Sequence, residues 1–322
     1  EKEVEVKVEV EEVEPPCPPE AIIKNFIRPF DLSCAPLFRV AWIRKKDEKY
    51  LLMLDMHHII TDGISMEIFT REFVRLYVGD QLPPLKLQYK DYSEWRNSEP
   101  EQAAAARQKS YWLQELAGER PLLNLPTDFP RPVVQVFEGS QCRFEIEAGP
   151  VEALRKCARE QGATLYMVLL SLYTILLSKI SNQEDIVVGT PVAGRQDPDL
   201  QETIGMFVNT LALRNYPREA VTFKHFLGEV KEHCLEAFAR QDYPYEELVE
   251  ALSLTRDTSR NPLFETMFVL QNPDIIEIEI PGPELKPYDG FENRIAKFDL
   301  MLTVIENGPC LVCGFEYATK LF

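Results

Sequence analysis

The sequence predicts an α/β protein made of two sandwich-like subdomains. Two kinds of segment are mixed along the chain. In some, apolar and polar residues alternate, as in strands; in others, apolar residues recur every three or four positions, as in helices. Both kinds of segment occur on each side of a proline-rich stretch at 118–139. We therefore predict a first subdomain at 1–117, a linker at 118–139 and a second subdomain at 140–322.

The first subdomain opens with a strand pattern. Valines alternate with Glu or Lys in 1–14, which predicts a half-buried strand, and four prolines between 15 and 19 end it. Ile64, Ile68 and Phe69 begin one apolar helical face that continues to Tyr77. In chain order we predict a helix at 20–28, strands at 37–43 and 50–56, and helices from 64 onward and at 101–116.

The linker is predicted from its prolines. Four of them (121, 126, 130 and 132) fall within a dozen positions. Proline fixes φ and has no amide hydrogen to donate, so the stretch should be extended and free of helices and strands.

The second subdomain is centred on the most apolar segment, 165–180. Ser171, Thr174 and Ser178 interrupt it and it is too short to span a bilayer, so it predicts a buried core helix. Cys310 and Cys313 have metal or redox spacing, but no second pair accompanies them and their apolar surroundings favour a core strand. The predicted elements are strands at 141–146, 185–188, 266–270, 298–305 and 310–315, and helices at 151–161, 165–180, 223–240 and 245–252.

Composition excludes several classes of protein. With 322 residues, 45% apolar and 27% charged, the chain should form a globular fold with a substantial core. Its 35 basic and 52 acidic residues give a net charge of −17, which argues against binding nucleic acid or an anionic membrane. The seven cysteines are scattered and odd in number, which favours reduced thiols over a disulfide framework. The chain opens on Glu-Lys-Glu, without the basic and then apolar stretch of a signal peptide. We predict a cytoplasmic protein and, because no initiator Met is present, a fragment.

The segment 57–63, which reads His-His-Ile-Ile-Thr-Asp-Gly, is the best candidate for chemistry. It lies where the predicted strand 50–56 gives way to a helix, a place where a scaffold can present side chains to ligands. If strand geometry persists there, His57 and His58 point to opposite faces. Asp62 follows His58 by four residues, and Gly63 permits close backbone approach.

Three interpretations of this segment compete. It could be a polar strand end in which Asp62 caps the helix, a metal site with His58 and Asp62 as ligands, or a proton-handling histidine without a metal. A serine-nucleophile elbow and a phosphate-binding glycine loop are both absent from the sequence.

Five motifs occur in a fixed order along the chain. They are His57–Gly63, Tyr89–Trp95, Ile204–Thr210, Gln241–Glu246 and Arg256–Leu263. Together they resemble the condensation domain of nonribosomal peptide synthetases, and the resemblance covers essentially the whole chain. A His-His-x-x-x-Asp motif by itself would not be specific.

The resemblance implies a fold. The family has two chloramphenicol-acetyltransferase-like subdomains arranged in a V-shaped pseudo-dimer, with the reaction site in a tunnel between them. Two family motifs that precede the histidines, one with an Arg-His-Glu core, are absent here, as is the helix that closes the second subdomain. We therefore expect an incomplete first subdomain with exposed sheet edges, and weak or no activity from this chain by itself.

The resemblance also implies an acyltransferase reaction of antibiotic and other secondary metabolism. An acyl or peptidyl group passes from a donor carrier-protein thioester to the α-amino group of an aminoacyl thioester on an acceptor carrier, which forms a peptide bond. The substrates ride on phosphopantetheine arms of the partner carriers, and the domain itself needs neither metal nor bound cofactor. The implied partners are the upstream and downstream carrier domains and a neighbouring adenylation domain.

Residue roles carry over by motif position. His58 is the catalytic candidate, as a base for the attacking amine or as the group that holds the amine and stabilises the intermediate. His57 would be mainly structural. Asp62 would form an ion pair with an arginine that fixes the loop, with Arg195 as first choice and Arg256 as second.

Two further positions are implied to line the reaction tunnel. Asn261 would donate a hydrogen bond there, and Gly63 would keep the acceptor side open.

Two alternatives remain open. An epimerization domain shares the histidine signature, although Val208–Thr210 and Ile64–Met66 favour condensation. Heterocyclization relatives replace the histidines with aspartates and fit less well. A non-catalytic module that docks carriers or recruits other enzymes would tolerate truncation, but the retained His58 and Asp62 count against it.

Overall fold

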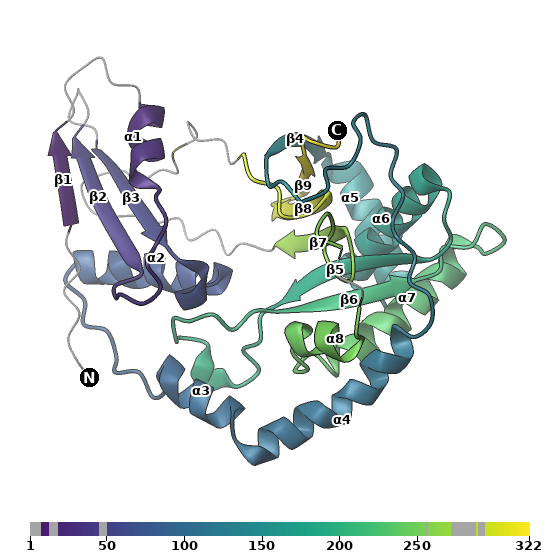
Figure 1. The fold of residues 1–322 in the computed structure, drawn as a ribbon, viewed down its shortest axis with the longest axis horizontal. Helices are drawn as coiled ribbons and strands as arrows, with labels where there is room; N and C mark the ends of the chain where they lie inside the picture. The colour runs from purple at the N-terminus through teal and green to yellow at the C-terminus, as the bar shows by residue number, and fades with distance from the viewer. Residues whose placement is uncertain (1–7, 13–18, 45–49, 255–256, 272–287, 289–293) are drawn as a thin grey trace. The chain divides into compact units, whose positions relative to one another are not determined.

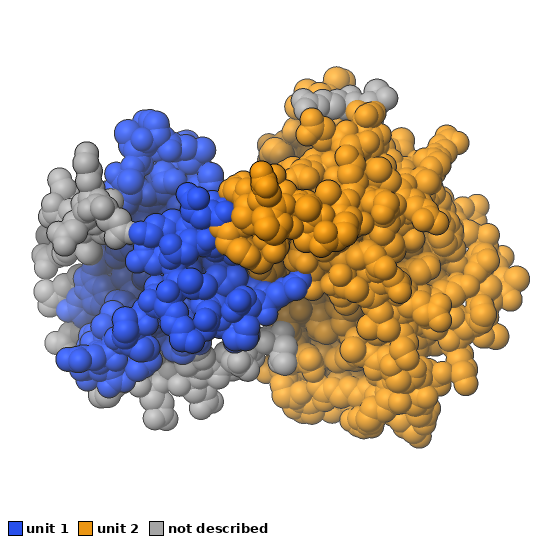
Figure 2. Space-filling view, turned by 90° about the horizontal axis from the view of Figure 1, so that it is seen from below, with its two compact units in different colours: residues 1–94, 195–207, 276–292 blue, residues 95–194, 208–275, 293–322 orange. Residues whose placement is uncertain are grey.

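The computed structural model of the protein describes residues 8–12, 19–44, 50–254, 257–271, 288 and 294–322. The chain forms two compact units, shown in separate colours in Figure 2. Unit 1 comprises 1–94, 195–207 and 276–292, and unit 2 comprises 95–194, 208–275 and 293–322. This division differs from the predicted one at 118–139, because segments distant in sequence join each unit.

Unit 1 contains a three-stranded sheet with the order β1-β2-β3 (Figure 1). Strand β1 runs parallel to β2, and β2 runs antiparallel to β3. Ala41 and Ile43 on one face of β2 pack with helix α1, whereas Phe38, an even-numbered position on the other face, contacts Phe69 of helix α2. The elements are β1 (Val8–Glu12), α1 (Pro19–Phe26), β2 (Phe38–Arg44), β3 (Tyr50–Met56), α2 (Gly63–Tyr77) and α3 (Tyr89–Arg96).

Unit 2 is built on a six-stranded mixed sheet with the order β4-β9-β8-β7-β5-β6. Helix α6 is its central helix, and packs against β5, β7, α5 and α7. Its buried side chains, Val168, Leu170 and Leu177 among them, form part of the main core. The elements are α4 (Glu99–Glu115), β4 (Gly139–Ile146), α5 (Ala148–Glu160), α6 (Leu165–Ser181), β5 (Ile186–Val192), β6 (Asn209–Asn215), α7 (Phe223–Phe238), α8 (Tyr245–Ala251), β7 (Thr266–Gln271), β8 (Leu300–Asn307) and β9 (Cys310–Ala318).

Helix α4 and the proline-rich stretch both belong to unit 2. Trp112 of α4 is 1% exposed and its indole donates to the carbonyl of Arg240 at 2.9 Å. The stretch after it is extended, as predicted, and is tied to the unit: Arg131 pairs with Asp299. The 118–139 region therefore packs as part of unit 2.

The predicted elements within the described residues are present, with ends shifted by a few residues. Among the described α-helices and β-strands, helix α3 and strand β6 were not predicted. The pattern at 1–14 is described only for 8–12, where it forms β1. Cys310 and Cys313 lie in β9, and because they are three positions apart they point to opposite faces of the strand, which confirms the core-strand interpretation.

In the described part of the chain, no single helix has the length and apolar character needed to cross a membrane. Helices α5 and α6 meet that test only as a pair, bent by 108° at their junction.

Candidate active site

The histidine pair lies in a tight turn between β3 and α2. Strand β3 ends at Met56, and His58–Ile60 form a single 3₁₀ turn capped by His57. The Ile59 amide donates to Nδ1 of His57 at 3.1 Å, so this imidazole holds the turn in place. The strand alternation considered for the two histidines therefore does not apply, since the chain turns before it reaches His58.

The two imidazoles have different surroundings. His57 is half-buried and meets the edge of the Phe30 ring, with centroids 6.1 Å apart. His58 is exposed, and its imidazole has no hydrogen-bond partner among the described residues. His58 is thus the member of the pair whose ring nitrogens are available to a ligand.

Asp62 caps the N-terminus of α2. Its Oδ1 accepts the backbone amide of Ser65 at 2.8 Å and the Ser65 hydroxyl at 2.7 Å, which satisfies one of the free amides at the start of the helix. Gly63 follows as the first residue of α2. The interpretation of Asp62 as the cap of this helix is therefore confirmed.

The same carboxylate forms a buried ion pair with Arg195. Nη2 of Arg195 lies 3.0 Å from Oδ1 and 3.3 Å from Oδ2 of Asp62, and the side chains are only 3% and 5% exposed. A second guanidinium nitrogen, Nη1, donates to the carbonyls of Leu200 and Thr203. The Phe207 ring lies 4.0 Å from the guanidinium carbon. Asp62 is thus paired with Arg195, the first of the two arginines that the resemblance implied.

Hydrogen bonds determine the ionisation of Asp62. Burial by itself would raise the pKa of this carboxyl. Donors from the Phe207 amide, Ser65 and Arg195 together outweigh burial and hold the pKa of Asp62 below its ordinary value of 3.8. The carboxylate therefore stays ionised at neutral pH and fixes the loop.

The hydrogen bonds that Asp62 already accepts disfavour the interpretation of this segment as a metal site. Both oxygens of Asp62 already accept hydrogen bonds, from Arg195 and from the amides of Ser65 and Phe207, so the carboxylate is not available to a cation. Within the described ranges there is also no group of three or more His, Cys, Asp or Glu residues that could hold a metal ion.

Three of the five motifs meet around this ion pair. The Phe207 amide donates to Oδ2 of Asp62 at 3.0 Å, which joins motif 204–210 to the histidine motif. The rings of Tyr89 and Tyr92, from motif 89–95, pack on Phe207 at centroid distances of 5.1 and 4.6 Å. Spacing along the chain could not reveal this cluster, because motif 204–210 is more than a hundred residues from both of the other motifs.

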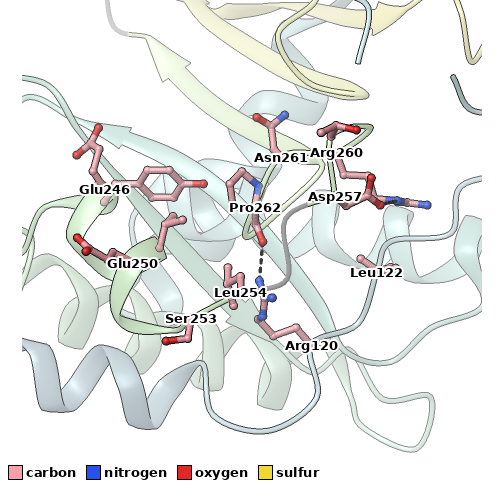
Figure 3. Close-up of a pocket in the computed structure, with 13 residues that line it drawn as sticks. Arg120, Leu122, Glu246, Glu250, Ser253, Leu254, Asp257, Arg260, Asn261 and Pro262 are labelled. Atoms are coloured by element: carbon pink, nitrogen blue, oxygen red, sulfur yellow. Dashed lines mark hydrogen bonds and ion pairs between the residues drawn. The ribbon is translucent and has the colours of Figure 1, made fainter. Parts of the chain in front are cut away.

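The remaining predicted site residues are not among the described residues that contact Asp62 in unit 1. Asn261 belongs to unit 2, donates to the Lys297 carbonyl at 3.0 Å and borders a hollow of about 860 Å³ in that unit (Figure 3). Arg120 lies in the same hollow and donates to the carbonyl of Pro262. Arg256 falls outside the described residues.

Sequence reasoning assigned no structural role to Ser65. Its hydroxyl contacts Asp62, Arg195 and the backbone of Gly205. The sequence does contain a signal for this role. Ser65 stands three positions after Asp62 at the start of a helix, a spacing that brings the serine hydroxyl within hydrogen-bond distance of the capping carboxylate.

Comparison with known proteins identifies similar chains. The family model for the Condensation domain matches residues 1–322. Surfactin synthase subunit 1 of Bacillus subtilis (strain 168) is 49% identical over 303 residues, and tyrocidine synthase 3 of Brevibacillus parabrevis is 50% identical over 303 residues. Each match covers 94% of this chain but only 8% and 5% of the respective relative.

Solved structures share the fold. The X-domain from teicoplanin biosynthesis superposes with a TM-score of 0.84 at 24% identity, covering 99% of this chain and 75% of that one. A four-domain nonribosomal peptide synthetase bound to AMP and glycine gives a TM-score of 0.82 at 23% identity, covering 99% of this chain and 26% of that one. The predicted fold class, that of the condensation domains, is confirmed.

Proposed function

The chain belongs to the condensation-domain family of nonribosomal peptide synthetases, and we propose that it forms the peptide bond between two carrier-bound substrates. The amine nitrogen of the acceptor attacks the carbonyl carbon of the donor thioester. The new C–N bond forms as the C–S bond breaks, the donor thiol leaves, and the amine gives up one proton.

The match of the family model across residues 1–322 carries this proposal. The local geometry supports it, because His58 projects an unengaged imidazole from a turn that Asp62 and Arg195 hold in place. In this proposal His58 acts on the attacking amine, as its base or as the group that positions it. Asp62 acts on the loop and does not touch the substrate.

Gly63 is proposed to leave room for the acceptor. A Cβ at this position would meet no atom within 4 Å, so the described packing of the chain does not require glycine there. An acceptor substrate that passes close to this backbone would explain why the position carries glycine. Asn261 is proposed to donate a hydrogen bond to a bound substrate, as the resemblance implies.

The proposed partners follow from the reaction. One carrier domain presents the donor and another presents the acceptor, each on a phosphopantetheine arm, and a neighbouring adenylation domain loads the amino acid. Because the carriers supply both thioesters, the reaction requires no metal or bound cofactor from this chain.

A single-turnover assay tests the function. A donor carrier bearing an acyl group and an acceptor carrier bearing an aminoacyl group are mixed with the full-length protein that contains this chain, and the mass on the acceptor arm is followed. We expect the donor mass to appear on the acceptor with wild-type protein and with His225→Ala, which alters an exposed histidine of α7. His58→Ala should abolish the transfer.

A second variant separates the two roles of His58. Glutamine can hydrogen-bond an amine but cannot take its proton, so His58→Gln retains transfer if positioning suffices and loses it if a base is needed. If no donor group reaches the acceptor arm but deuterium from the solvent enters the α-carbon of a carrier-bound aminoacyl group, the protein is instead an epimerase. Carrier binding without any chemistry would leave a docking module.

A further inference from the structure

The hydroxyl of Ser65 joins two parts of unit 1. Ser65 is fully buried in the first turn of α2. Its Oγ lies 2.7 Å from Oδ1 of Asp62 and 2.8 Å from Nη2 of Arg195. It also lies 2.8 Å from the carbonyl oxygen and 3.1 Å from the amide nitrogen of Gly205. We call residues 195–207 the strap, since this segment packs in unit 1 although its neighbours along the chain belong to unit 2.

These four contacts use the full capacity of a hydroxyl group. Oγ accepts hydrogen bonds from Arg195 and from the Gly205 amide, and it shares its single hydrogen between Asp62 and the Gly205 carbonyl. A side chain without a hydroxyl would leave both polar groups of the Gly205 backbone without this partner in a buried place, which costs more than the bond itself contributes.

The other side of the strap is held by Tyr89 of α3. A Cβ added at Gly205 would lie 2.1 Å from Cδ2 of the Tyr89 ring, so only glycine allows this approach. The Tyr89 hydroxyl donates to the carbonyl of Met206 at 2.8 Å. Ser65 and Tyr89 therefore clamp the strap from α2 and α3.

We propose that Ser65 is a positioning residue of the candidate active site. The Phe207 amide and Arg195, both on the strap, hold the carboxylate of Asp62. Asp62 in turn follows the His58–Ile60 turn by two residues. By fixing the strap to α2, Ser65 keeps Asp62 in place and so sets the orientation of His58. The effect of this role on catalysis rests on the proposed function, whereas the clamp itself does not.

Hydrogen exchange in the full-length protein tests the clamp without any need for activity. The amides of Gly205 and Phe207 both donate into the cluster. In Ser65→Ala we expect them to exchange roughly 10- to 100-fold faster, since a buried partner is lost. Thr70→Val is the matched control: it removes from the same helix a hydroxyl that donates only to the Met66 carbonyl, and should leave both amides unchanged. Unchanged exchange in Ser65→Ala would overturn the proposal.

A pair of variants at the opposite side of the strap gives a second test, in case Ser65→Ala fails to fold. Gly205→Ala should speed exchange of the Phe207 amide, because the new methyl group collides with the Tyr89 ring. Tyr89→Phe keeps the ring and removes the hydroxyl that donates to the Met206 carbonyl, so it should speed this exchange less than Gly205→Ala does. Exchange of the Phe207 amide at the wild-type rate in Gly205→Ala would show that the clamp is wrong.

The two-carrier assay then tests the consequence for the site. Ser65→Ala should slow the transfer step at saturating carriers by roughly 10-fold or more while the half-saturating carrier concentrations stay unchanged, because Ser65 orients His58 and contacts no substrate. Wild-type transfer by Ser65→Ala would overturn the positioning role. Wild-type protein that shows no transfer would refute the proposed function, and the exchange measurement would still decide on the clamp.

Discussion

Arg195→Met removes the positive half of the buried ion pair and leaves most of the packing. The apolar stem of methionine can still contact Phe207, but the carboxylate of Asp62 loses two contacts at 3.0 and 3.3 Å. Because both side chains are at most 5% exposed, water cannot replace the guanidinium without opening the site. Breaking a buried pair by removing one partner costs about 3–5 kcal/mol, and we expect unit 1 to lose this much stability.

Urea denaturation of the single variants Arg195→Met and Asp62→Asn and of the double variant measures this loss. The double variant should be less destabilised than the sum of the singles, by about 1–3 kcal/mol, since its remaining groups include no unpaired buried charge. Arg159→Met is the control, because Arg159 pairs with Glu152 at the surface with both side chains more than 60% exposed. It should cause no measurable change. A loss under about 1 kcal/mol in Arg195→Met, or strictly additive effects, would refute the reasoning.

Two further predictions concern unit 2. Glu265 is buried, which raises its pKa above the ordinary 4.5 in spite of Arg260. The folded protein therefore binds more protons than the unfolded one just above pH 4.5, so the free energy of unfolding should fall as the pH rises through that interval, and Glu265→Gln should reduce this fall in urea titrations. An identical pH profile in Glu265→Gln would contradict this. Burial also raises the pKa of Cys234 to about 12, so iodoacetamide at pH 8 should alkylate the exposed Cys34 and Cys142 and spare Cys234 in peptide mass spectra. Equal labelling of Cys234 and Cys34 would show that the core opens readily.

The sequence alone determined the elements whose signals are local. The apolar run at 165–180 forms α6, and prolines keep 118–139 extended, because helix periodicity and proline geometry depend only on nearby residues. The ordered motifs indicated the right family, and the ion pair of Asp62 with Arg195 was expected from that resemblance. Helix α3 was missed because its sequence, YKDYSEWR, is only eight residues long and mostly polar. Strand β6 was missed because Arg214 interrupts its apolar run, and this buried arginine is paired with Asp185.

The resemblance left two arginines as partners for Asp62, and the tertiary structure decided for Arg195, 133 positions away. Only the tertiary structure brought Ser65 to Gly205, which are 140 positions apart. Nothing in the composition or periodicity of either segment fixes such a distance, because it depends on the path of the chain through both units. The strap shows this most clearly: it leaves β5 of unit 2 and packs in unit 1, where the hydroxyl of Ser65 and the ring of Tyr89 hold it. The sequence therefore supplied the histidines, and the fold supplied the contacts that hold them in place.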